Sequence, residues 1–524
     1  KDINPGPNGS GPYELTNVNG TLFFRATDGI NGIGLWKSNG TSEGTVPIIV
    51  SDPAVGKAFF FSNFVNGDGV LFFLAAVSYN DFILWKSDGT TDGTSLIKKF
   101  DPEGKSFTSF LTFVNRTLFF IANDQEHGIE LWRSNGTAEG TLLVKDINPV
   151  GDSQLYGLTN VNGTLFFFNN KGFVNGYELW KSDGSADGTV LLKTFPGGFS
   201  SPFIPTNANG TLFFFANDGV SGFELWKSDG TATGTVLVKD INPGNGSSIS
   251  SNSFYQSELI NVNGTLFFGA VEGTTTGLEL WKSDGSLEGT VLVKDINQTV
   301  IVNSFPRSLT AVNGSLFFWA FHDIQRISLW KSDGTPEGTL LVKDLTSEKI
   351  SQILLLTDVN GTLFFASHYD AFSNNKLWKS DGTADGTVEV GPPFNPIYLT
   401  NVDGTLLFSA EGAGAGLELW ALKTQTTSVN EGDGQPALFG LFQNYPNPFN
   451  PSTKISFALP SAQEVTLKIF NLAGQEVATL LDNEHRAAGV HALTFEAQHL
   501  PSGIYLYRLQ AGEFVETKRM VLIR

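Results

Sequence analysis

One short segment recurs nine times along the chain and organises most of its length. A clear copy runs from Phe223 to Ile241 and reads FELWKSDGTATGTVLVKDI. Consecutive tryptophans of these copies lie 42 to 55 residues apart. A period of roughly 40–50 residues is typical of propellers and other repeat arrays, so the repeat constrains the fold before any single motif does. The Leu-Trp pair of the segment begins at Leu35, Leu84, Leu131, Leu179, Leu225, Leu280, Leu329, Leu377 and Leu419.

Each repeat predicts four short antiparallel strands. In the first unit, residues 15–18 and 21–26 flank Asn19-Gly20, which favours a tight hairpin turn because both turn positions take positive φ. The Leu-Trp-Lys segment at 35–37 predicts a third strand, and residues 45–50 predict a fourth after a polar turn. Four antiparallel strands in one repeat match one blade of a β-propeller.

Paired phenylalanines indicate how these units pack. Phe23 and Phe24 are adjacent in a predicted strand, and adjacent strand residues point to opposite faces of the sheet. A sheet with large rings on both faces has to be covered on both faces. Blades that stack around an axis provide this cover, whereas an isolated sandwich leaves one face of each sheet in water.

The two ends of the repeat region predict how the array closes. The ninth unit has its hairpin at 399–409 and its Leu419-Trp420 strand, but no TVLVKDI segment follows. The chain starts with Lys1–Gly6, which is similar to Lys239–Gly244 at the end of that segment. We therefore expect residues 1–422 to form an all-β propeller of about nine four-stranded blades, with an N-terminal strand completing the last blade. An open β superhelix is the alternative.

The rest of the chain has a different composition. Residues 423–436 have no periodicity and are interpreted as a linker, and residues 437–524 are expected to form a small immunoglobulin-like β-sandwich. Its strand-like runs are 454–459, 464–470, 476–481, 491–495, 503–509 and 514–523.

Charge and cysteine content exclude several classes of function. The net charge is −19, and residues 437–524 hold seven acidic and seven basic side chains, so the excess belongs to the repeats. Such an acidic surface disfavours nucleic acid and anionic membranes as partners. The chain has no cysteine, which excludes disulfides and thiolate metal sites. No apolar run reaches the ~20 residues that a membrane-spanning helix needs.

The polar turn after the third strand is the one repeated place where a metal site is considered. Carboxylates four residues apart, together with threonine hydroxyls and carbonyls, could hold Ca²⁺. The favoured interpretation is a structural turn, because Asn39 and Asn135 replace the first Asp and Thr233 replaces the second acidic residue. The Ca²⁺ candidates are Asp88, Asp92, Asp183, Asp187, Asp381 and Asp385.

No other residue pattern predicts catalysis or a cofactor site. The histidines lack the spacing of zinc ligands, and no phosphate-binding loop, dinucleotide fingerprint or nucleophile elbow is present. Acidic residues are plentiful, but nothing singles out a pair for glycoside hydrolysis. Nine of the ten tryptophans hold the same repeat position, which indicates core packing; Trp319 is the exception, and gap filling and ligand contact remain open for it. We therefore predict that the protein is not an enzyme.

The repeat resembles the bacterial ELWxxDGT family, with residues 224–231 as a close match to its name. The turn also resembles the Asp box of sialidase propellers, where it is structural, but the repeats lack the arginine cluster that a sialidase needs. The ELWxxDGT resemblance covers residues 1–422 and implies a secreted or surface repeat protein of β-propeller type.

The C-terminal region resembles a type A sorting domain of the type IX secretion system. The resemblance implies export across the outer membrane of a Bacteroidetes-type Gram-negative bacterium, with the secretion machinery as a partner. Its matching segments include 444–451, 469–477, 500–505 and 518–522. The sorting residues it implies are Tyr445, Pro446, Asn447, Pro448, Phe449, Asn450, Pro451, Gly503, Tyr505 and Lys518.

Together these features predict a secreted or cell-surface structural or adhesive protein. Self-assembly through its termini or its C-terminal domain, or contact with a surface partner, is part of this expectation. A carbohydrate-binding propeller is the alternative and a glycan hydrolase the third interpretation. For a ligand binder, the non-repeat insertions at 195–205 and 245–257 are expected to form a pocket rim.

Overall fold

The structure is a computed structural model of the 524-residue chain. The chain divides into two compact units, Lys1–Thr424 and Gln425–Arg524, and each is considered by itself. The described residues are 1–52, 56–78, 81–100, 108–172, 176–196, 203–249, 258–273, 277–297, 303–323, 326–346, 350, 352–368, 375–412, 414, 416–423, 440–441, 444, 449–472, 474–512 and 514–522.

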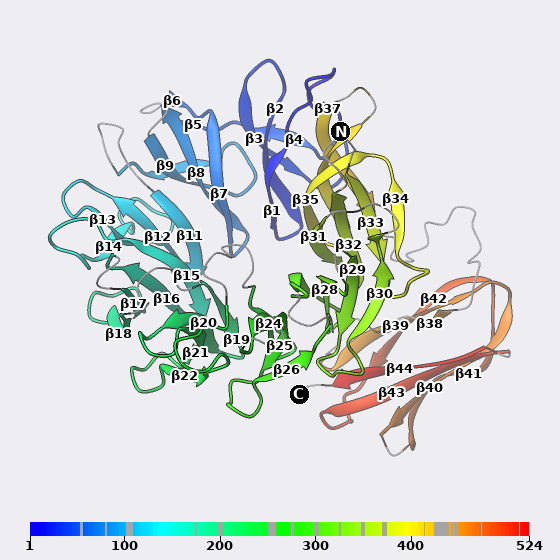
Figure 1. The fold of residues 1–524 in the computed structure, drawn as a ribbon. Coiled ribbons are helices and arrows are strands. Elements are labelled where there is room, and N and C mark those ends of the chain that lie inside the picture. Colours follow the sequence, from blue (N-terminus) through cyan, green and yellow to red (C-terminus); the bar gives the residue numbers. More distant parts are fainter. Residues whose placement is uncertain are drawn as a thin grey trace. The chain divides into compact units, whose positions relative to one another are not determined.

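The described part of the first unit contains nine antiparallel sheets that follow one another along the chain (Figure 1). The first four are sheet 1, with β1 (Tyr13–Val18), β2 (Thr21–Thr27), β3 (Ile33–Ser38) and β4 (Val46–Ile48); sheet 2, with β7 (Phe60–Gly67), β8 (Val70–Ser78), β9 (Asp81–Ser87) and β10 (Ser95–Lys98); sheet 3, with β11 (Thr108–Val114), β12 (Thr117–Asn123), β13 (Ile129–Ser134) and β14 (Leu142–Lys145); and sheet 4, with β15 (Leu155–Val161), β16 (Thr164–Asn170), β17 (Tyr177–Ser182) and β18 (Val190–Phe195). The next four are sheet 5, with β19 (Phe203–Ala208), β20 (Thr211–Asn217), β21 (Phe223–Ser228) and β22 (Val236–Lys239); sheet 6, with β23 (Ile260–Val262), β24 (Thr265–Val271), β25 (Leu278–Ser283) and β26 (Val291–Lys294); sheet 7, with β27 (Arg307–Val312), β28 (Ser315–Phe321), β29 (Ile327–Ser332) and β30 (Leu340–Asp344); and sheet 8, with β31 (Gln352–Val359), β32 (Thr362–His368), β33 (Lys376–Ser380) and β34 (Val388–Gly391). Sheet 9 has three strands, β35 (Phe394–Val402), β36 (Thr405–Gly412) and β37 (Gly416–Lys423), and a separate pair is formed by β5 (Ser51–Asp52) and β6 (Gly56–Lys57).

The first hairpin of each repeat forms as the sequence predicts. Asn19 and Gly20, which join β1 to β2, have φ values of 47° and 83°, the left-handed conformation that a type I′ turn requires. Asn17 accepts a hydrogen bond from the Gly20 N–H (2.9 Å) and closes this turn. The prediction of four antiparallel strands per unit is confirmed for sheets 1 to 8.

The paired phenylalanines lie on opposite faces of their sheets. Phe23 packs with Phe61 and Phe73 in the core between sheets 1 and 2. Phe24 packs with Trp36 in the core between sheets 1 and 9, which also contains Leu407 and Leu419. Both faces of sheet 1 are therefore covered by neighbouring sheets, as the sequence predicts.

Contacts between first strands run in a cycle through the nine sheets. In chain order, the first strand of each sheet contacts the first strand of the next one, from β1 and β7 through to β31 and β35. β35 also contacts β1, so the last sheet lies beside the first. Figure 1 shows the same succession, from the blue strands of sheet 1 to the yellow strands of sheet 9.

The N-terminal segment docks on sheet 9 without forming the predicted fourth strand, which is a correction to the sequence analysis. Lys1–Ile3 lies outside any strand, although the α-amino group of Lys1 donates to the carbonyl of Leu419 (3.1 Å). The reason lies in the repeat: Lys1 corresponds to Lys145, the last residue of β14. Asp2 and Ile3 therefore correspond to residues that follow the fourth strand in sheets 3, 5 and 6.

Contacts between sheets 9 and 1 repeat those between other neighbours. Lys145 Nζ donates to the Thr189 carbonyl of the next sheet (2.9 Å), and Lys1 Nζ donates to the Thr45 carbonyl of sheet 1 (2.8 Å). The same lysine-to-threonine bond is formed by Lys98, Lys239, Lys294 and Lys343 with Thr141, Thr290, Thr339 and Thr387. The seam is therefore built by the chemistry of the repeat itself.

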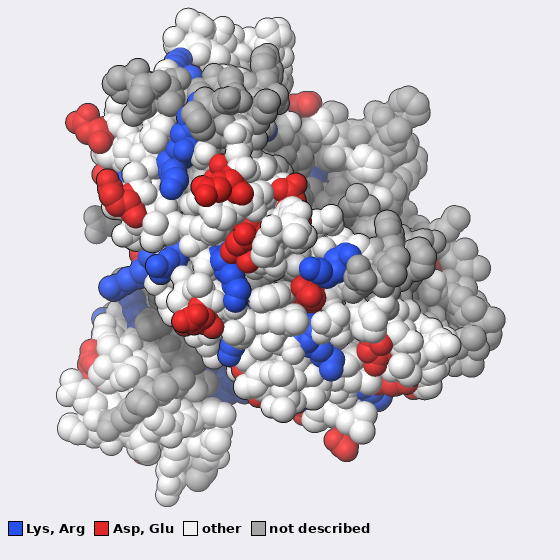
Figure 2. Space-filling model, turned by 90° about the vertical axis from the view of Figure 1, so that its left-hand side faces the viewer, with Lys and Arg blue, Asp and Glu red and all other residues white. Residues whose placement is uncertain are grey.

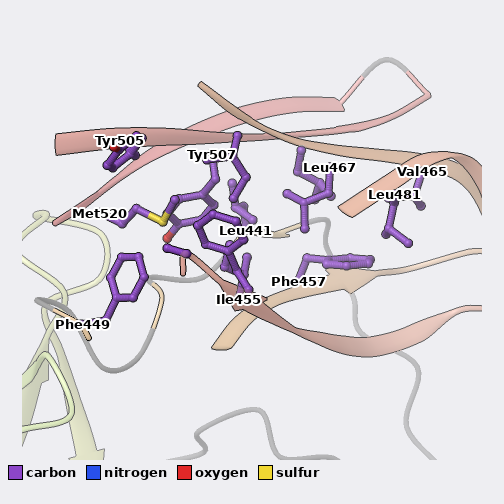
Figure 3. Close-up of a cluster of buried hydrophobic side chains, with 14 of the residues drawn as sticks. Leu441, Phe449, Ile455, Phe457, Val465, Leu467, Leu481, Tyr505, Tyr507 and Met520 are labelled. Carbon is purple, nitrogen blue, oxygen red and sulfur yellow. The ribbon is translucent and has the colours of Figure 1, made fainter. Parts of the chain in front are cut away.

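The second unit contains two antiparallel sheets around one hydrophobic core. One sheet has the order β38 (Gly440–Leu441), β39 (Ser452–Leu459), β42 (Gly489–Glu496), and the other has β41 (Glu476–Arg486), β40 (Gln463–Asn471), β43 (Gly503–Ala511), β44 (Phe514–Leu522). Side chains from both sheets meet in this core, among them Ile455, Leu467 and Tyr507 (Figure 3). The six predicted strand-like runs each coincide with one of the strands β39 to β44. The predicted linker, residues 423–436, lies outside the described residues except for Lys423.

The docked N-terminal segment gives a direct test of the seam. Glu418 accepts hydrogen bonds from the N–H groups of Ile3 (2.9 Å) and Asn4 (3.3 Å). We expect Glu418→Ala to accelerate hydrogen exchange of these two amides by at least about tenfold, because bonds to a charged acceptor contribute more than neutral ones. Residue-resolved exchange on the full chain measures this. In the matched control Glu224→Ala, the Ile3 and Asn4 amides should exchange as in the native chain; equal acceleration in both variants would contradict a local seam contact.

Candidate functional site

The repeat turn between the third and fourth strands is closed by its own side chains. In sheet 5, Asp229 Oδ1 accepts hydrogen bonds from the Thr231 N–H and hydroxyl (both 2.8 Å). Thr231 Oγ1 in turn accepts from the Gly234 N–H (2.9 Å), and the hydroxyls of Ser228 and Thr235 meet at 2.8 Å across the base of the turn. These bonds satisfy the backbone within the turn, as Asx turns do.

The same geometry holds at the first residue of each Ca²⁺ candidate pair. Asp88, Asp183 and Asp381 accept from the N–H and hydroxyl of the residue two positions on, which is threonine or serine. The second carboxylates are exposed in the same turns, at Asp92, Asp187 and Asp385. Within the described ranges, no group of three or more His, Asp or Glu side chains gathers where a metal ion could be held. The turn therefore has the structural role that the sequence favours, and its Ca²⁺ alternative stays a prediction.

The turn also carries packing between sheets. A Cβ at Gly234 would collide with the Asp229 carboxylate, and Gly230 (φ 88°) lies against the Phe166 ring of sheet 4. Hydrogen bonds from the Thr231 hydroxyl and N–H lower the pKa of Asp229, so its carboxylate stays ionised as an acceptor. The Asp-Gly pair thus fixes both the local turn and its fit to the preceding sheet.

A substitution series separates the structural turn from a metal site. We expect Asp229→Asn to leave the melting temperature within about 2 °C of the native value, because the amide oxygen can cap the same donors. Asp229→Ala should lower stability by about 1 kcal/mol, the usual cost of a lost capping acceptor. Differential scanning calorimetry with and without EDTA measures both effects. A melting temperature that falls with EDTA in the native chain would instead indicate Ca²⁺.

Buried glutamates form a second repeated constellation, which the sequence analysis did not identify. Glu224 is fully buried and accepts from the N–H groups of Ile241 (2.9 Å), Asn242 (3.2 Å) and Ser248 (3.0 Å). Glu130 and Glu279, at the same repeat position, likewise accept from backbone N–H groups of the segment that follows the fourth strand. Glu418 accepts from the N–H groups of Ile3 and Asn4 in the N-terminal segment. The sequence signal was an acidic residue directly before a buried Leu-Trp pair.

Burial raises the pKa of Glu130, Glu224 and Glu279. Loss of hydration raises the pKa of Glu224 to about 8 and that of Glu279 to about 7, although the backbone donors favour the ionised form and oppose the shift. Both carboxyl groups accept hydrogen bonds from backbone N–H groups, so these residues with raised pKa values have a structural role. The charges of Asp240 and Asp295 add to the upward shifts of the pKa of Glu224 and Glu279, respectively.

The raised pKa of Glu224 predicts a pH-dependent stability. Its folded pKa of about 8 lies above the unfolded value of 4.5, so the folded state holds a proton that the unfolded state releases between these pH values. The free energy of unfolding should therefore fall as pH rises from 4.5 to 8, by up to about 1.4 kcal/mol per pH unit for this group. Glu224→Gln removes the group, so the stability advantage of the native chain over the variant should shrink between pH 5 and 8.

Denaturant unfolding of the native chain and the variant at several pH values measures this difference. The same experiment on Glu279→Gln should show a window that ends near pH 7; a constant difference across pH would contradict the assignment.

Exposed aromatic side chains on first strands are another feature that the sequence analysis missed. Tyr13 on β1 and Tyr398 on β35 are 36% and 38% exposed, with ring centroids 5.1 Å apart. The Arg25 guanidinium lies 5.1 Å from the Tyr13 ring centroid and 4.8 Å from that of Phe60. β1 and β35 each contain a β-bulge with a left-handed residue, Glu14 and Tyr398, which changes the direction of the neighbouring side chains. Non-glycine residues with positive φ also lie in the first strands of other sheets, namely Asn63, Phe110, Ser308 and Leu355.

The remaining candidates fall within the scaffold. Trp319 is 4% exposed and packs in the core between sheets 7 and 8, which settles its role as gap filling. His127 pairs with Asp124 (2.8 Å), whereas His322 and His368 hydrogen-bond to Ser328 and Asn375. Of the insertions at 195–205 and 245–257, residues 197–202 and 250–257 lie outside the described part of the chain.

In the second unit, several expected sorting residues have structural roles. Phe449 is buried and donates its N–H to the Val521 carbonyl (2.9 Å), and Pro451 accepts from the Ala497 N–H (2.9 Å). Asn450 is exposed next to them. Tyr505 is buried, and its hydroxyl donates to the Pro501 carbonyl (2.8 Å), as in the tyrosine corner of β-sandwiches. Figure 3 shows Phe449 and Tyr505 at one end of this core.

The other sorting residues contribute less to the described structure. Lys518 forms an ion pair with Glu516 (3.2 Å) on β44. Gly503 begins β43 without a positive φ, and a Cβ there would make only an ordinary contact with Tyr505, so local geometry does not require glycine. Tyr445, Pro446, Asn447 and Pro448 lie outside the described residues.

A family comparison identifies the second unit. Residues 443–523 match the family described as a secretion system C-terminal sorting domain. The sorting domain supports a secreted or outer-surface protein of a Bacteroidetes-type bacterium that interacts with the type IX secretion machinery. No curated protein matches the sequence. Within the described residues, no helix is long and apolar enough to cross a membrane.

Solved structures show only distant similarity to the chain. A structure from a study of two prolyl endopeptidases is 11% identical, with a TM-score of 0.40, and 71% of this chain and 55% of that chain are covered. Prolyl oligopeptidase B from Galerina marginata is 10% identical, with a TM-score of 0.36 and coverage of 71% and 57%. A eukaryotic initiation factor is 10% identical, with a TM-score of 0.43 and coverage of 74% and 90%. The chain thus spans little more than half of either peptidase, and similarity this low gives no argument about its activity.

Proposed function

We propose that the chain is a secreted, non-enzymatic β-propeller of nine blades that serves as a structural or adhesive scaffold outside the cell. Residues 1–422 form the ring, residues 423–436 link it to the sorting domain, and residues 437–524 direct export. The resemblance of the repeats to the ELWxxDGT family supports this proposal. The sorting domain supports the location, and the repeats support the absence of catalysis.

The scaffold proposal is carried by one observation: the repeated polar residues form hydrogen bonds to other parts of the fold. The buried Glu224 binds backbone N–H groups of its own repeat, Lys239 reaches the Thr290 carbonyl of the next sheet, and Asp229 caps its turn. A catalytic site needs polar groups that remain available to a substrate. The repeated polar residues of this chain instead form hydrogen bonds within and between its own sheets.

A closed ring, rather than an open superhelix, is supported by the seam. Lys1, which is docked on sheet 9, donates to the Thr45 carbonyl of sheet 1. Asn17 of sheet 1 donates to the Asn401 carbonyl of sheet 9, as Asn207 of sheet 5 donates to the Asn160 carbonyl of sheet 4. Sheets 9 and 1 also share a hydrophobic core. In an open array, the faces of sheets 9 and 1 that meet in this core would both be exposed to water.

Carbohydrate binding is the second candidate function, favoured by the exposed Tyr13–Tyr398 pair beside Arg25. Exposed aromatic rings can stack on sugars, and a guanidinium can donate hydrogen bonds to hydroxyl or acidic groups. Figure 2 shows one face of the molecule, where Lys and Arg side chains lie among Asp and Glu side chains.

Secretion of the full chain in a Bacteroidetes-type host tests the proposed function. We expect the native protein at the cell surface or in the medium, and a variant that lacks residues 443–523 to remain in the periplasm. The secreted protein should mediate cell or surface attachment and cleave no glycan. Surface fractionation, attachment assays and a glycan array measure these properties. Array binding that Tyr398→Ala removes would select the carbohydrate-binding alternative, and export of the truncated variant would contradict the role of the sorting domain.

A further inference from the structure

One position of the second strands holds a charged side chain in a single repeat. Arg25 of β2 pairs with Tyr13 of β1 and Leu35 of β3. The residues at this register position in the other eight second strands are uncharged, namely Leu74, Ile121, Phe168, Phe215, Gly269, Trp319, Ala366 and Ser409. Leu74 fills the position in sheet 2 as part of a hydrophobic core. Packing between sheets therefore does not explain the charge of Arg25.

Aromatic rings from three sheets surround the Arg25 guanidinium. Its central carbon lies 5.1 Å from the ring centroid of Tyr13 and 4.8 Å from that of Phe60 on β7. The Tyr13 ring in turn lies beside the partly exposed ring of Tyr398 on β35. Partial loss of hydration raises the pKa of Tyr398, and the nearby positive charge of Arg25 opposes that rise. The guanidinium is thus held where sheets 9, 1 and 2 meet.

The hydrogen-bond donors of this guanidinium are not used by the fold. Arg25 is half-buried, and its Nε is buried without a hydrogen-bond acceptor among the described residues. Within the same residues Arg25 forms no ion pair, whereas the exposed Arg116 and Arg326 each pair with an aspartate. The ring contacts use the positive charge of Arg25 but none of its N–H groups. These donors are therefore available to an acceptor that is not part of the fold.

A second arginine provides an internal comparison. Arg307 on β27 lies 5.5 Å from the ring centroids of both Phe305 and Trp319, and its Nε is also buried without an acceptor among the described residues. Burial raises the pKa of Glu258, and the charge of Arg307 opposes this rise. Arg307 thus has a similar aromatic setting, but its charge already acts on a buried carboxyl group of the chain itself.

A sugar ring that carries a carboxylate matches the surroundings of Arg25. A planar guanidinium binds a carboxylate through two parallel N–H···O bonds. The partly exposed rings of Tyr13 and Tyr398 offer apolar faces and hydroxyl groups to a pyranose. The repeat region holds the excess negative charge of the chain, so long-range repulsion disfavours a densely charged polyanion and favours a ligand with few carboxylates.

We propose that Arg25, Tyr13 and Tyr398 form a binding site for a sugar that carries a carboxylate, such as a uronic acid. The carboxylate accepts hydrogen bonds from the Arg25 guanidinium, and the pyranose ring packs against the two tyrosines. This inference rests on the carbohydrate-binding candidate and deepens it by naming the class of ligand. It is independent of the scaffold function and of export.

Methyl β-glucuronide, which carries one carboxylate, is the probe, and its neutral methyl ester is the matched ligand. In a ligand-observed NMR titration with the full chain, the glucuronide should bind saturably. The ester should bind at least about tenfold more weakly, because it has lost the charge of the acceptor.

Substitution of Arg25 tests the protein side of the contact. Arg25→Leu copies the residue that sheet 2 has at this position, so the variant should melt near the native temperature and yet bind the glucuronide at least about tenfold more weakly. Arg25→Lys keeps the charge but loses the paired donors, so it should also bind more weakly. Arg307→Lys is the matched control, and it should bind as the native chain does.

Absence of glucuronide binding by the native chain, or equal binding by Arg25→Leu, would overturn the proposal. Equal binding of the methyl ester would also overturn it, and would leave neutral sugars as the ligands of the carbohydrate-binding candidate. Acetate that binds as tightly as the glucuronide would overturn the role of the sugar ring and assign the site to a carboxylate alone. The scaffold function is tested separately, by export and attachment.

Discussion

Burial of aromatic rings on both faces of every sheet is the constraint on which the first unit depends. Phe23 and Phe24 cannot both leave water unless sheet 1 has a neighbour on each side, and sheets 2 and 9 provide those neighbours. The same condition holds for each repeat, so no single sheet could be stable alone. Stability is therefore a property of the array, and it requires the first and last sheets to cover each other.

Polar residues of the repeat then fix how neighbouring sheets meet. The lysine at the end of a fourth strand bonds to a threonine carbonyl of the next sheet, and in sheet 5 the Nζ of Lys239 also lies 5.5 Å from the ring centroid of Trp281. The glycine of the polar turn lies against a phenylalanine of the preceding sheet, as Gly230 does with Phe166. The repeated motif, which looks like a functional signature, thus supplies the contacts that hold neighbouring sheets together.

The ninth repeat departs most informatively. It retains Glu418, which accepts hydrogen bonds from Ile3 and Ser10, but among the described residues no polar turn and fourth strand follow β37. The N-terminal residues restore the lysine and isoleucine contacts of a complete repeat without restoring the strand.

The sequence by itself determined the repeat, the four-stranded units, the two-sided burial of Phe23 and Phe24, the structural turn and the small C-terminal β unit. These features depend on local turn chemistry and strand alternation, which short segments encode. The tertiary structure decided that Lys1–Ile3 docks without forming a strand, that the Glu before Leu-Trp is a buried acceptor, and that Tyr13 meets Tyr398. Each of these contacts joins residues that are far apart in the chain or lie in different segments of a repeat. A local sequence pattern does not specify which of these residues come into contact when the sheets pack.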